Sequence, residues 1–191
     1  MGRAAKGSKF ERWVAMQLSN WWTCGQSDSV FWRTSGSGAR ASTRSKANQR
    51  TAFQYGDLCA TDPIGQPFID LITVEIKRGY NRHTIADLLD KPLKARVQTY
   101  QDWFAKAQRD HERAGSFSWL LIVKRDLRET IVFMPKVLET ELFHAGAEFT
   151  KPMLWLTVDS SKGLLDVVGM TFTSFVIGVS PEHVRQLVKE V

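Results

Sequence analysis

The spacing of apolar residues along the chain predicts alternating helices and strands. Residues 8–22 carry apolar side chains at the helical period, which places Phe10, Val14 and Leu18 on one face of a helix. Other helical patterns cover 91–115, 135–146 and 181–191. Runs rich in β-branched and apolar residues predict strands at 54–60, 71–79, 117–126, 129–135, 153–158 and 167–179.

The order of the first elements is helix, strand, strand, helix, strand, strand, which indicates an α/β fold. With 191 residues, of which 43% are hydrophobic, we expect a single domain over 1–191 with a sizeable core. The motif-bearing core covers about 6–135, and 136–191 is expected to be a C-terminal extension of the same domain. That extension carries no motif, so extending the sheet, forming a dimer surface and shaping substrate access all stay open.

Candidate chemistry begins with Asp57, Glu75 and Lys77. Residues two apart on a strand share a face, so Glu75 and Lys77 project side by side. A hairpin turning near 64–65 would place Asp57 opposite Thr73, one pleat step from Glu75. Two carboxylates so close repel unless a cation lies between them. We therefore expect Asp57 and Glu75 to be catalytic and to bind Mg²⁺, and Lys77 to position or deprotonate a water.

The same residues also allow simpler interpretations. A Glu-x-Lys at a strand end is by itself typical of a solvated strand end. Glu11 is a further catalytic candidate, because it lies at the margin of the apolar helix face and a carboxylate there requires a partner. Ser8 and Glu11 also have the spacing of a capping box. The sequence leaves open whether Glu11 is a cap, an active-site residue or both.

Basic residues are concentrated before Asp57. Residues 1–56 hold nine Lys or Arg and two acids, whereas 57–191 hold 17 basic and 18 acidic residues. Between 29 and 56 the cations are interleaved with hydroxyl, amide and glycine residues, which suits a phosphate backbone; a basic loop without a ligand is the alternative. The expected nucleic-acid-binding residues are Arg33, Ser35, Ser37, Arg40, Arg44, Lys46 and Arg50.

The order and spacing of these motifs resemble the PD-(D/E)xK nuclease superfamily, most closely the branch of archaeal and phage Holliday-junction resolvases. Gly56, which stands where the superfamily has Pro, is a departure, but the chemistry needs the carboxylate that follows it. The similarity covers about 6–80. The residues that carry it are Gly7, Glu11, Arg12, Arg33, the run 35–38, Asp57, Glu75 and Lys77.

The resemblance implies a restriction-endonuclease-like α/β core, with a central mixed β-sheet flanked by helices. It also implies a Mg²⁺-dependent DNA endonuclease, with Mn²⁺ able to substitute, that hydrolyses phosphodiester bonds with resolvase-like structure specificity. The implied partners are DNA and a second copy in a homodimer. A restriction or repair enzyme, an end-processing nuclease and a non-catalytic DNA-binding protein stay as alternatives. Some nucleases of the superfamily carry a glutamine on the next helix, here Gln98 or Gln101.

Other classes of function are disfavoured. The four histidines are scattered and none has zinc-site spacing. No apolar stretch is long enough for a transmembrane helix, so we expect no membrane partner. Two cysteines are too few for a disulfide framework, which favours a reduced, cytoplasmic protein. Trp32, next to Arg33, is the tryptophan best placed to stack on a base.

Overall fold

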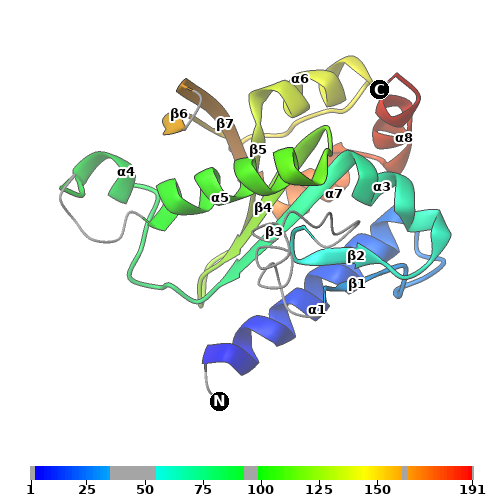
Figure 1. The fold of residues 1–191 in the computed structure, drawn as a ribbon, viewed down its shortest axis with the longest axis horizontal. Helices are drawn as coiled ribbons and strands as arrows, with labels where there is room; N and C mark the ends of the chain where they lie inside the picture. Colours follow the sequence, from blue (N-terminus) through cyan, green and yellow to red (C-terminus); the bar gives the residue numbers. More distant parts are fainter. Residues whose placement is uncertain (1–2, 35–54, 93–98, 161–162, 191) are drawn as a thin grey trace.

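The central element of the fold is a mixed β-sheet. A computed structural model describes residues 3–34, 55–92, 99–160 and 163–190, and within these the sheet has five strands (Figure 1). Their spatial order is β3 (Ile72–Arg78), β4 (Ser118–Lys124), β5 (Thr130–Pro135), β7 (Gly163–Thr171) and β6 (Leu154–Ser160). Only the β3–β4 pair is parallel, because a long crossover joins those two strands. The expected α/β fold with a central mixed sheet is confirmed.

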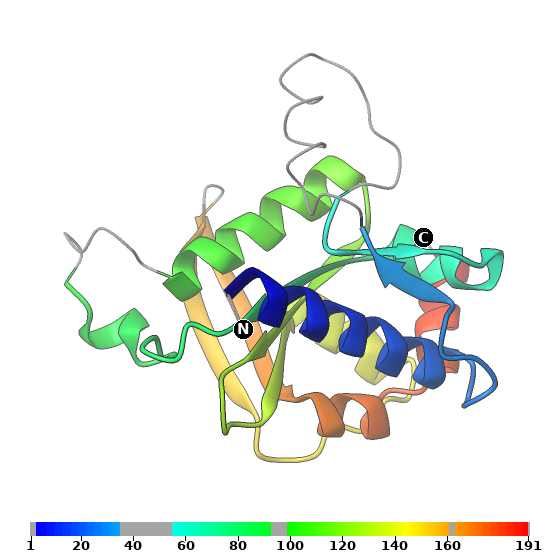
Figure 2. The ribbon, with the colours of Figure 1, turned by 90° about the horizontal axis from the view of Figure 1, so that it is seen from below.

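The sheet separates two apolar cores. Side chains alternate along β4, so Leu120 and Ile122 enter one core while Leu121 and Val123 enter the other. The second core is covered by α5 (Thr99–Ala114), on the opposite side of β3 and β4 from the first helix (Figures 1 and 2). Helices that contribute to the first core are α1 (Arg3–Trp22), α3 (Gln66–Leu71), α6 (Lys136–His144), α7 (Phe172–Gly178) and α8 (Pro181–Glu190).

A short antiparallel pair lies beside the main sheet. It consists of β1 (Phe31–Arg33) and β2 (Leu58–Ala60). An aromatic cluster anchors it to the first core: the ring centroids of Phe31 and Phe68 are 5.1 Å apart and those of Trp22 and Phe68 are 5.6 Å apart. This pair therefore has a fixed position next to β3.

The predicted hairpin between Asp57 and Glu75 is wrong. The chain between β2 and β3 forms a 3₁₀ turn, η1 (Pro63–Gly65), followed directly by α3. The Asp62 side chain accepts a hydrogen bond from the Ile64 backbone N–H at 2.9 Å, and a proline near the start of each helix supplies a suitable backbone angle. Cap and proline chemistry here start a helix in place of a tight turn, and β2 pairs with β1.

Two other predicted elements need correction. The first helix begins at Arg3, so Ser8 and Glu11 lie inside it and the capping-box interpretation is wrong. The strand expected over 167–179 ends at Thr171, whose hydroxyl accepts from the Ser174 backbone N–H at 3.0 Å and so caps α7.

The helix expected over 91–115 corresponds to α5, which ends before Gly115, where φ is +74°. The short α4 (Asp87–Asp90) precedes that range, and residues 93–98 lie outside the described part of the chain. Beyond residue 136, β7 and β6 extend the sheet from β5, and α6 and α8 appear where helices were expected. In the described ranges no helix is both long and apolar enough to cross a lipid bilayer.

Candidate active site

Glu75 and Lys77 project from β3 toward α5. Val74 and Ile76, which alternate with them, enter the opposite core, as the two-residue period of a strand requires. The side chain of Glu75 is only 1% exposed, and its Oε1 atom pairs with the Nζ of Lys77. The two side chains therefore lie side by side, as the sequence predicted, and the structure adds that the carboxylate is buried.

Asp57 reaches the same place by binding the free edge of β3. Its backbone N–H donates to the Val74 carbonyl at 2.7 Å, and its Oδ2 accepts from the Ile76 N–H at 2.8 Å. These two contacts flank Glu75 along the strand. Asp57 thus lies next to Glu75, although the expected hairpin does not bring it there.

Gly56 makes this close approach possible. Its φ is +81°, in the region that favours glycine, and a Cβ at this position would lie 2.7 Å from the Val74 carbonyl oxygen. The superfamily's proline fixes φ near −65°, so it could not adopt this backbone conformation. The departure noted in the sequence therefore has a local structural cause.

The two carboxylates influence each other electrostatically. Burial, followed by the charge of Glu75, raises the pKa of Asp57 to about 6, against the opposing effects of Lys77, the Ile76 N–H and Lys106. Asp57 is itself only 5% exposed. Two buried acids in such proximity are stabilised by a cation placed between them.

The structure adds two charged residues that the sequence analysis missed, Lys106 and Asp110 of α5. Lys106 Nζ lies 2.6 Å from Glu75 Oε2 and 2.7 Å from Asp110 Oδ2. Burial lowers the pKa of Lys106, but the charges and hydrogen bonds of Glu75 and Asp110 outweigh burial and leave the pKa raised. The i, i+4 spacing of Lys106 and Asp110 was visible in the sequence, whereas the contact with Glu75 depends on how α5 packs on β3.

Glu11 is tied to Arg33. The Arg33 Nε is 3.1 Å from Glu11 Oε2, and Arg33 Nη1 donates to the Ser8 hydroxyl at 2.6 Å. Arg33 pairs in register with Leu58, the neighbour of Asp57, and the backbone N–H of Thr34 donates to the Asp57 carbonyl at 3.0 Å. Glu11 and Arg33 therefore border the strand pair that positions Asp57, and Glu11 has an ionic partner as its location on α1 requires.

The carboxylates of Asp57 and Glu75 fit a hard divalent cation, because such a cation prefers oxygen ligands. Asp57 and Glu75 together supply the one or two protein carboxylates that such a site needs, with waters and phosphate completing it. In the ranges that the structure covers, no group of three or more His, Cys, Asp or Glu residues gathers as a metal site. Among the described residues, Asp57 and Glu75 are therefore a pair of carboxylates that could hold such a cation.

A comparison with protein families identifies the family of the chain. Residues 2–186 match the model of a family described as "Phage putative PDDEXK endonuclease". The chain belongs to this phage endonuclease family. No curated protein matches the chain, and no solved structure matches it either. Membership of the PD-(D/E)xK superfamily is confirmed, and the match to this phage endonuclease family includes the β7 and β6 extension as well as the motif region.

The other predicted residues are placed as follows. Gln101 of α5 donates to the Asp159 carbonyl of β6, and Trp32 of β1 is 48% exposed. The expected residues outside the described ranges are Ser35, Ser37, Arg40, Arg44, Lys46, Arg50 and Gln98.

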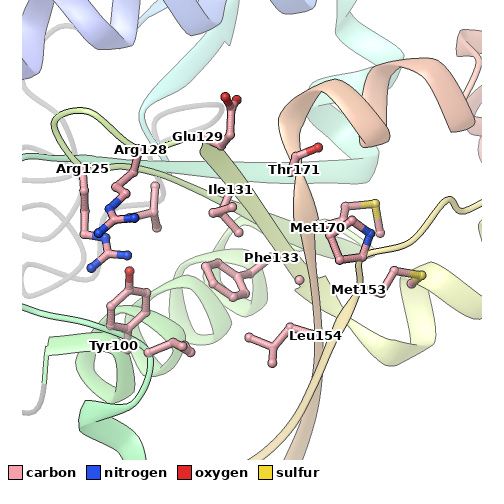
Figure 3. Close-up of a pocket in the computed structure, with 14 residues that line it drawn as sticks. Tyr100, Arg125, Arg128, Glu129, Ile131, Phe133, Met153, Leu154, Met170 and Thr171 are labelled. Carbon is pink, nitrogen blue, oxygen red and sulfur yellow. The ribbon is translucent and has the colours of Figure 1, made fainter.

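A separate cavity of about 450 Å³ lies on the α5 side of the sheet (Figure 3). Its walls are mostly apolar, with Arg125 and Arg128 near Tyr100 at one end and Met153 and Leu154 at the other. Neither Asp57 nor Glu75 lines it. The cavity is thus distinct from the acidic pair.

The approach of Gly56 to β3 generates a stability prediction. Gly56→Ala should lose more stability than Gly115→Ala, because both backbones have positive φ but only the Cβ at 56 meets other atoms within 4 Å. The left-handed strain shared by both variants costs about 1–2 kcal/mol, so Gly56→Ala should lose more than that. Urea unfolding of the two variants measures the difference; equal losses would contradict the close approach.

Proposed function

We propose that this protein is a Mg²⁺-dependent DNA endonuclease whose active site contains Asp57, Glu75 and Lys77. The observation that supports the proposal most is the convergence of two buried carboxylates and an ammonium at the edge of β3. Along the chain Asp57, Glu75 and Lys77 occur in the order of the D, the D or E, and the K of the PDDEXK pattern that names the family, whereas Gly56 replaces its P.

Each residue has a distinct proposed role. Asp57 and Glu75 would hold Mg²⁺, or Mn²⁺ in its place, which supplies positive charge to the phosphoryl oxygens and makes a bound water more acidic. Lys77 orients the attacking water or moves its proton, because its ammonium is held beside Glu75. Arg33, paired with Glu11 at the border of the site, would contact a phosphate next to the scissile bond, and Glu11 holds the guanidinium in place.

The basic residues that precede Asp57 support a proposal of DNA binding. The basic segment from Arg33 to Arg50, which lies mostly outside the described ranges, contains no acid and would contact backbone phosphates. We also propose a four-way junction as the preferred DNA form and a two-fold homodimer as the active species, since symmetric cutting of two strands requires two equivalent sites. Cys24 and Cys59 are both free thiols, which supports a cytoplasmic setting.

Removing either carboxylate charge should stop cleavage without unfolding the chain. Asp57→Asn and Glu75→Gln keep the side-chain shapes but lose the anionic ligands, so cleavage of labelled DNA in Mg²⁺ should fall below detection while binding in its absence persists. Asp70→Asn, an exposed acid on α3, is the matched control and should stay active. Activity within tenfold of the unaltered protein in either site variant would contradict the assignment of Asp57 and Glu75 as metal-binding catalytic residues.

Lys77→Met should slow the chemical step. Loss of a water-positioning or proton-transferring ammonium is expected to lower the single-turnover rate by about 10² or more while DNA binding is retained. Lys124→Met removes the same charge near the end of the neighbouring strand β4 and should leave the rate unchanged. An unaltered rate for Lys77→Met would reduce Lys77 to a structural counter-ion of Glu75.

The DNA form can be tested by cleavage of sequence-matched linear duplex, single strand, flap and four-way junction in Mg²⁺. We expect fastest cutting of the junction, at symmetric positions, by a dimer that sedimentation detects with and without DNA. Faster cutting of linear duplex or of ends by a monomer would instead assign a restriction, repair or end-processing activity.

A further inference from the structure

The Glu75 carboxylate already holds two cations. Lys77 pairs with Oε1, and Lys106 Nζ lies 2.6 Å from Oε2. A Mg²⁺ ion bound by a carboxylate lies about 2.0–2.1 Å from the oxygen. A divalent cation on Glu75 would thus approach one of these ammonium groups closely, and repulsion between like charges would displace that ammonium.

The contacts of the two lysines indicate which one moves. Lys106 already contacts a second acid, Asp110 Oδ2 at 2.7 Å, whereas in the part of the chain that the structure describes Lys77 pairs with Glu75 alone. The side chain of Lys106 is also more exposed, at 35% against 18% for Lys77. Lys106 and Asp110 are one helical turn apart on α5, so their pairing survives if Lys106 leaves Glu75.

We propose that Lys106 is a displaceable counter-ion of Glu75: it neutralises this carboxylate before a divalent cation binds, and transfers wholly to Asp110 when the cation arrives. Asp110 is then the residue that receives Lys106, and Lys106 competes with the cation for Glu75. This inference rests on the proposed function only in taking Glu75 as a cation ligand. Lys106 is a positioning residue in this scheme, and its effect is on cation affinity.

Competition predicts effects of opposite sign for the two α5 residues. Lys106→Met removes the competitor, so the affinity for Mn²⁺ should rise about tenfold. Asp110→Asn removes the second acceptor and keeps Lys106 on Glu75, so the affinity should fall about tenfold. In the double variant the Asp110 change should alter the affinity by less than about threefold, because the lysine through which Asp110 acts is absent.

The measurement is a titration of the full chain with Mn²⁺ in the absence of DNA, followed by the electron paramagnetic resonance signal of free Mn²⁺. Arg109→Met is the matched control for Lys106→Met, because it removes a positive charge from an exposed position of α5. Asp102→Asn is the matched control for Asp110→Asn, because it removes a negative charge from another exposed position of that helix. Their affinities should stay within about twofold of the unaltered protein, because solvent and salt screen exposed charges.

Thermal unfolding supplies a second readout. Without divalent ions, Lys106→Met should unfold at a lower temperature than the unaltered protein, because Glu75 and Asp110 lose their shared cation. Added Mn²⁺ should raise its Tm by more than that of the unaltered protein, as tighter binding requires. If Lys106→Met does not fold, Lys106→Gln offers a neutral donor of similar length and should show the same rise in affinity.

Two outcomes would overturn the inference. One is an equal loss of Mn²⁺ affinity for Asp110→Asn with and without Lys106, which would make Asp110 a direct or long-range cation partner. The other is an unchanged or weaker affinity when the charge of Lys106 is removed. Glu75→Gln in the same titration separates the two proposals: if it leaves Mn²⁺ affinity unchanged, the metal assignment itself fails, whatever Lys106 does.

Discussion

Burial of the Glu75 carboxylate is the constraint around which the site is arranged. Glu75 lies in register with the fully buried Leu121 of β4, and α5 covers both. A charge in this location is strongly destabilising unless cations and hydrogen bonds compensate for lost water. The strand supplies one cation from Lys77 and the helix supplies another from Lys106. The position of α5 on β3 therefore places a positive charge beside Glu75 as well as burying apolar side chains.

The helix α5 performs both tasks with different side chains. Trp103, Phe104 and Ala107 pack into the second core, while Lys106 contacts both Glu75 and Asp110. Because packing of the apolar residues fixes the helix against the sheet, the charged residues are held at a defined distance from Glu75. A site built on such rigid elements keeps its geometry better than one built on loops.

Asp57 illustrates a second way to assemble a site. Within the described sheet β3 is an outer strand, so one of its edges pairs with no other strand of that sheet. Asp57 binds two backbone groups at this edge, one through its backbone N–H and one through its carboxylate. The positive φ of Gly56 turns the chain so that this contact is possible without a steric clash. The β1–β2 pair then links Asp57 to Arg33 and, through it, to Glu11 on α1.

Local rules were sufficient for part of this arrangement. The period of two along a strand determines that Glu75 and Lys77 share a face, apolar patterning indicates the α/β class, and the motif order indicates the nuclease superfamily. The route from Asp57 to Glu75 was mispredicted, because a capped helix and a hairpin turn use the same Asp, Pro and Gly residues.

Only the tertiary structure decided that Lys106 and Asp110 join the site and that Glu11 pairs with Arg33. These contacts depend on how a helix is rotated and docked against a distant strand. Such docking is set by the packing of whole faces and not by the spacing of any short motif, so the sequence alone does not reveal it.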